Sequence, residues 1–129
     1  MTTITIALPP SVNSIWRFGR GGRVHKSTRY CAWQRTAGWE LAAQRPKRVA
    51  GPVKVSIAAG RPDRRRRDID NLSKSLLDLL QVHRVIKDDS MVTSLAARWD
   101  EAIPAGTVRV TVEAAMVNSV NSGSSALRT

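Results

Sequence analysis

The chain has 129 residues, of which 42% are hydrophobic, and its formal net charge is +11. This length suits one compact domain rather than two, and the hydrophobic content argues against general disorder. The single cysteine, Cys31, excludes an internal disulfide, no Cys/His spacing suits zinc, and no apolar run approaches the ~20 residues of a membrane span. Because the N-terminus also lacks a secretory pattern, we expect a soluble, cytoplasmic protein without membrane contacts.

The first half of the chain predicts two strands and one helix. Alternating β-branched and apolar residues predict a strand over 2–8, which Pro9-Pro10 ends. Residues 11–26 combine glycine, arginine and aromatic residues, and this composition predicts a mobile basic loop. Apolar side chains at three- and four-residue spacing predict a helix over 27–44, with Ser27 as its N-cap. A second strand is expected over 52–59.

The second half predicts a further helix, two strands and a tail. A helical stripe of isoleucine and leucine predicts a helix over 68–81. Strands are expected over 91–99 and 107–113, and the Ser/Asn-rich tail over 115–129 is expected to be disordered. The order β–α–β–α–β–β predicts an α+β fold: a single domain over 1–114, with a small mixed sheet and two main helices packed against it.

The distribution of charge separates the two halves of the chain. Residues 1–67 hold 15 lysines and arginines against 2 acidic residues, whereas residues 68–129 hold 6 against 8. A basic surface binds nucleic acid by neutralising phosphates and releasing counterions. The first half therefore indicates a polyanionic partner, while the second half concentrates the carboxylates.

The most informative segment is the arginine run 64–67, followed by Asp68, Asp70 and Lys74. Adjacent arginines repel one another, so they face water or a polyanion. With Asp68 in the loop that enters the helix and Asp70 in the first turn, both carboxylates can be directed at one point. Lys74 lies four residues after Asp70 and therefore shares its helix face.

A second acidic pair, Asp88-Asp89, lies just before the strand expected over 91–99. If that strand lies beside the helix over 68–81, the two acidic groups can converge, and a hard divalent cation would relieve their repulsion. Ligands that are all oxygen favour Mg²⁺ or Mn²⁺ over zinc. Such a cation activates water and polarises a phosphoryl oxygen, and Lys74 would stabilise charge in the transition state.

Each of these features also has a structural interpretation. An aspartate at the start of a helix commonly caps it, Lys74 can pair with Asp70 or Asp78, and two aspartates in a turn are ordinary. The residues alone therefore leave two functions open, a metal-dependent nuclease and a non-catalytic DNA- or RNA-binding module. A nuclease for flaps or single strands is a third interpretation.

The sequence resembles the RusA family of Holliday junction resolvases. The matching motifs occur in order: Pro9-Pro10-Ser11-Val12-Asn13 with Trp16-Arg17, then the segment PDRRRRDIDNLSK over 62–74, then Leu77-Asp78, and finally Asp88-Asp89 with Val92. Together they cover roughly residues 3–114, and the segment over 62–74 is long and specific.

The resemblance implies a homodimer that binds branched duplex DNA, a four-way junction, and makes paired symmetric nicks with Mg²⁺, for which Mn²⁺ substitutes. It implies Asp68, Asp70 and Asp89 as catalytic, metal-binding carboxylates, Lys74 as the catalytic lysine, and Asp88 as a lesser metal ligand. DNA contacts are expected from the basic N-terminal loop and from the segment that enters the helix: Arg17, Arg20, Arg23, Lys26, Arg64, Arg65, Arg66, Arg67 and Asn71.

Overall fold

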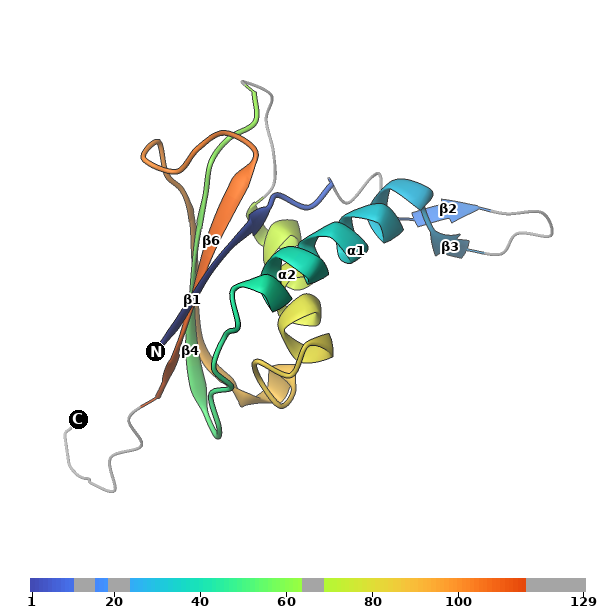
Figure 1. Cartoon of the computed structure of the whole chain (residues 1–129). Coiled ribbons are helices and arrows are strands. Elements are labelled where there is room, and N and C mark those ends of the chain that lie inside the picture. The colour runs from blue at the N-terminus through green and yellow to red at the C-terminus, as the bar shows by residue number, and fades with distance from the viewer. Residues whose placement is uncertain (11–15, 19–23, 64–68, 116–129) are drawn as a thin grey trace.

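The computed structural model describes residues 1–10, 16–18, 24–63 and 69–115, which include a four-stranded sheet with two helices on one of its faces (Figure 1). The strand order is β1-β6-β4-β5, in which β6 pairs antiparallel with β1 and β4, and β5 pairs parallel with β4. The strands are β1 (Thr2–Ala7), β4 (Val53–Ala59), β5 (Val92–Trp99) and β6 (Thr107–Ala114). The predicted α+β fold with a mixed sheet is confirmed.

The two helices are α1 (Thr28–Ala43) and α2 (Ile69–Val82), close to the predicted bounds. Ser27 caps α1, because its side chain accepts a hydrogen bond of 3.1 Å from the backbone N–H of Tyr30. Leu72, Leu76 and Leu80 lie on the buried face of α2, as their spacing predicted. None of the helices among the described residues has the length and apolarity that a membrane crossing requires.

The core lies between the sheet and the helices. Strand residues alternate between the two faces, so Ile4 and Ile6 of β1 and Val110 of β6 are almost fully buried, with at most 1% exposed. On the opposite face the same strands carry polar residues such as Thr5 and Arg109. This pattern explains why the alternation of residue types in the sequence was sufficient to predict both strands.

A parallel crossover sets the position of α2. Because β4 and β5 run in the same direction, the chain that joins them must return from the end of β4 to the start of β5. Helix α2 makes this return, so it begins at the end of the sheet where β4 and β5 terminate. It finishes near the start of β5, where the short 3₁₀ helix η3 (Asp89–Met91) leads into that strand.

The loop predicted over 11–26 is partly wrong. Two strands, β2 (Trp16–Phe18) and β3 (Val24–Lys26), pair antiparallel in a small separate sheet beyond the N-terminal end of α1 (Figure 1). Strands of three residues are too short to show an alternating pattern among glycines and arginines. The prediction for residues 116–129 of the tail falls outside the described residues.

Candidate active site

The N-terminal end of α2 carries the first group of predicted site residues. The backbone of Asp70 lies in the first turn of α2, at the end of the sheet where β4 and β5 terminate. Asp68 and Arg64, Arg65, Arg66 and Arg67 fall outside the described residues, as do the side chains of Asp70 and Asn71. Their roles stay predictions.

Lys74 lies one turn further along α2 and is exposed, opposite the buried face that contains Leu72 and Leu76. The ion pair with Asp78 that the spacing allowed is not formed. Among the described residues, the ammonium of Lys74 has no carboxylate partner within ion-pair distance. The alternative pair with Asp70 stays a prediction, because the side chain of Asp70 falls outside the described residues.

Asp88 has a structural role at the start of η3. Its Oδ1 accepts a hydrogen bond of 2.8 Å from the backbone N–H of Ser90 and a second, short one from the Ser90 hydroxyl. The bond from the Ser90 side chain is the main reason that the pKa of Asp88 lies below its usual value. Both bonds occupy Oδ1 of Asp88, and its part as a lesser metal ligand stays a prediction.

Asp89 is held by its backbone instead. Its N–H donates a hydrogen bond of 3.1 Å to Oε1 of Gln81, which lies in the last turn of α2. The side chain of Asp89 is exposed, and its carboxylate accepts no hydrogen bond from any residue that the structure describes. Sequence reasoning missed this contact, since nothing in the spacing connects Gln81 with Asp89.

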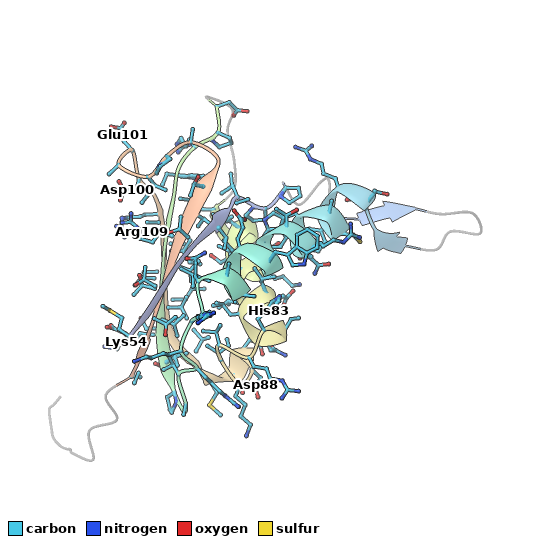
Figure 2. The ribbon with its side chains drawn as sticks, in the orientation of Figure 1. Lys54, His83, Asp88, Asp100, Glu101 and Arg109 are labelled. Atoms are coloured by element: carbon cyan, nitrogen blue, oxygen red, sulfur yellow. The ribbon has the colours of Figure 1, made fainter. Side chains whose placement is uncertain are left out.

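The two acidic groups lie toward opposite ends of α2. Asp70 and Gln81 are eleven residues apart on one helix, which separates them by about 16 Å along its axis. Asp88 lies at the opposite end of the molecule from Asp100 and Glu101, which follow β5 (Figure 2). Strand β5 does lie beside α2, as the sequence interpretation required, but it runs in the opposite direction. The residues just before β5 therefore meet the far end of the helix.

Within the described part of the chain, no three or more histidine, cysteine, aspartate or glutamate side chains gather as a metal site would require. This statement does not extend to Asp68 or to the side chain of Asp70. The exposed carboxylate of Asp89 is a hard oxygen donor of the kind that Mg²⁺ and Mn²⁺ prefer. A complete set of ligands would need at least one further acidic side chain beside it.

The predicted DNA-contacting residues of the N-terminal segment are placed only in part. Arg17 lies in β2 and Lys26 in β3, and in this small sheet Arg17 pairs with His25. Arg20 and Arg23 fall outside the described residues. Sequence reasoning also missed Arg61, whose guanidinium lies over the ring of Trp99 at the end of β5. The two residues are 38 positions apart, so no local spacing could have connected them.

Comparisons with known proteins agree on one family. A family profile described as "Endodeoxyribonuclease RusA" matches residues 7–114. The chain is 38% identical over 91 residues to "Crossover junction endodeoxyribonuclease RusA" of Escherichia coli strain K12, a match that covers 70% of this chain and 75% of that protein. A protein of the same name from Enterobacteria phage 82 is 38% identical over 90 residues, covering 69% and 74%.

A similar protein of the same name from Aquifex aeolicus is 39% identical over 74 residues. That match covers 57% of this chain and 59% of the Aquifex protein, less than two thirds of either.

Proposed function

Because this chain belongs to the RusA family of endodeoxyribonucleases, we propose that it resolves four-way DNA junctions by paired symmetric nicks that require Mg²⁺, with Mn²⁺ as a substitute. The observation that carries the proposal is the match of the family profile over residues 7–114, which includes the whole segment 62–74 and the pair Asp88-Asp89. The charge of +11 supports a polyanionic substrate.

The proposed cation ligands are Asp68, Asp70 and Asp89, with Asp88 as a lesser ligand. When bound, the cation would activate water and polarise a phosphoryl oxygen. Lys74 would contribute a positive charge where the transition state gains negative charge. The exposed position of Lys74 and its lack of an ion pair among the described residues support this role.

A homodimer is the second part of the proposal. Asp70 and Asp89 of one subunit lie toward opposite ends of α2, so one chain by itself does not bring the two acidic groups together. A two-fold axis that sets two α2 helices antiparallel would bring each helix start near Asp89 of the partner subunit. Two equivalent sites would result, as a substrate with two-fold symmetry requires.

The alternative function is a non-catalytic DNA-binding module. The separation of Asp70 from Asp89 in a single subunit favours it, because scattered carboxylates balance charge without binding a cation. A module of this kind would bind branched DNA equally well with and without Mg²⁺ and would not cut it.

The deciding experiment incubates the purified protein with synthetic four-way junctions of several core sequences, with Mg²⁺ or with a chelator. We expect symmetrically paired nicks in strands of like polarity with Mg²⁺, and binding without cutting in the chelator. Linear duplexes and flaps of the same sequences are the control substrates. Preferential cutting of flaps would indicate a flap nuclease instead of a junction resolvase. Intact binding without nicks in any junction would establish the non-catalytic module instead.

A further inference from the structure

Arg61 and Trp99 form a cation–π pair at the end of the sheet from which α2 begins. Arg61 follows β4 by two residues, and Trp99 is the last residue of β5. The guanidinium carbon of Arg61 lies 4.8 Å from the centroid of the Trp99 ring. This distance is within the range of a cation–π interaction, which is strongest over tryptophan.

Trp99 is anchored by the sheet and the core. It pairs in register with Ala59, which is fully buried, so its side chain points to the face of the sheet that the helices cover. The ring packs against the hydrophobic core and is only partly exposed. Trp99 is therefore a rigid platform, whereas Arg61 itself is exposed to solvent.

Arg61 has no partner for its N–H groups in the part of the chain that the structure describes. It forms neither an ion pair nor a side-chain hydrogen bond there. The ring of Trp99 accepts no conventional hydrogen bond from the guanidinium, and the N–H donors of a guanidinium match two oxygens of a phosphate. Because the contact with the Trp99 ring also restrains the long side chain of Arg61, less entropy is lost when a phosphate binds.

The neighbouring arginine provides a contrast. Arg98 precedes Trp99 in β5, so its side chain points to the opposite face of the sheet. It forms an ion pair of 3.2 Å with Asp100. The backbone N–H of Ala102 and then Arg98 hold the pKa of Asp100 below its usual value. The charge of Arg98 is therefore already matched within the protein, whereas that of Arg61 is not.

The location of the pair indicates its ligand. Arg61 lies three residues before the arginine run 64–67 and on the connection that leads to Asp70 in the first turn of α2. A phosphate bound by Arg61 would belong to the same DNA strand or branch that reaches the acidic residues. No described acidic side chain pairs with Arg61 to repel that phosphate.

We propose that Arg61, held over the ring of Trp99, binds a backbone phosphate of the DNA beside the cutting site. Trp99 is a positioning residue that acts through Arg61. This inference rests on the proposed function and deepens it, because it assigns a DNA contact to Arg61 and a positioning role to Trp99, and both residues lie outside the segment 64–74.

The test measures junction binding in a chelator, so that it does not depend on cutting, over a series of salt concentrations. Arg61→Gln should weaken binding about tenfold at low salt. It should also reduce the slope of log affinity against log salt by about 1, the value for one lost phosphate contact. Trp99→Leu should lower the slope by a smaller amount, and Trp99→Phe, which keeps an aromatic face, should restore most of it.

The double variant separates positioning from general damage. If Trp99 acts through Arg61, then Trp99→Leu should add little to the loss caused by Arg61→Gln. Arg98→Gln is the matched control, since it removes an already paired charge one residue away and should leave the slope unchanged. Thermal unfolding of each variant verifies that it is folded at the temperature of the measurement.

Two results would overturn the inference. The first is a salt dependence of binding in Arg61→Gln with the same slope as in the wild-type protein. The second is a loss of affinity from Trp99→Leu that is as large in the Arg61→Gln variant as in the wild-type protein. Failure of the wild-type protein to bind any junction would instead refute the proposed function, and this inference with it. Normal junction cutting together with an unchanged slope in Arg61→Gln would refute only the role of Arg61.

Discussion

The two ends of α2 use charged residues in different ways. Near its start, Lys74 and Arg61 have no ion-pair partner among the described residues. Beyond its last turn, Asp88 accepts two hydrogen bonds from Ser90, and Asp89 is tied through its backbone to Gln81. One end therefore carries exposed positive charge, while the other fixes the position of an exposed carboxylate. The length of the helix separates the two ends within one chain, and the proposed homodimer would bring them together between subunits.

The largest effect is expected at the start of α2. Asp70→Asn should reduce junction cutting by at least about 10³-fold, because it would remove one of the carboxylates proposed to bind the cation. Junction binding should persist or tighten, since a charge that repels phosphate is lost. Single-turnover cutting and binding in a chelator measure the two effects separately.

Glu101→Gln is the control for that variant, because Glu101 is an exposed acid in the turn after β5. It should cut at the wild-type rate. Loss of both binding and cutting in Asp70→Asn would identify Asp70 as a structural residue. The two ends of α2 would then no longer differ in the way described above.

Lys74→Gln should lower the rate of cutting about 100-fold, since a positive charge beside the developing negative charge contributes that much in comparable sites. Affinity for the junction should fall much less than the rate. Lys54→Gln, on the face of the sheet that the helices do not cover, serves as the control for removal of one lysine. If Lys54→Gln lowers the rate of cutting as much as Lys74→Gln does, Lys74 contributes only as part of the general basic surface.

Gln81→Leu tests the other end of the helix. It removes the acceptor that fixes the backbone of Asp89, and a hydrogen bond of this kind corresponds to about a fivefold effect. We expect the Mg²⁺ concentration for half-maximal cutting to rise by that factor, with the rate at saturating Mg²⁺ nearly unchanged. Val82→Ala, at the adjacent exposed position, should leave the Mg²⁺ dependence as it is. The same shift in both variants would mean that Gln81 does not position Asp89.

The smallest effect concerns Asp88 and pH. Because the pKa of Asp88 is lowered in the folded protein, its contribution to the stability of η3 is fully present above the unfolded pKa of about 3.9. That contribution is lost as the pH falls through the lower folded value. The protection of the backbone amides around η3 against hydrogen exchange, measured relative to the intrinsic exchange rate at each pH, should therefore fall below about pH 4. In Asp88→Asn this pH dependence should be absent. If the pH dependence persists in that variant, another titratable group causes it.

Much of the fold could be predicted because it depends on local patterns. Ser27 precedes an apolar helical repeat and caps it, and alternating residues in β1 and β6 place one face of each strand in the core. The strands β2 and β3 and the helix η3 were missed, since three residues carry too little periodicity to distinguish such elements from loops.

The candidate site could be predicted only as a set of residues. The spacing of Asp70, Lys74 and Asp89 gave no information on the direction of β5, and this direction moves Asp89 to the far end of α2. The pair of Arg61 and Trp99 depends on the parallel register of β4 with β5, a long-range feature that a single sequence does not contain.

The most direct measurement uses dimers with one Asp70→Asn subunit and one Asp89→Asn subunit, purified through two different tags. If each site combines residues of two subunits, the mixed dimer has one site with both defects and one intact site. We therefore expect it to nick one strand of a four-way junction, while either variant by itself is inactive. If the wild-type protein cuts the junction but the mixed dimer is as inactive as each single variant, the site is not shared between subunits.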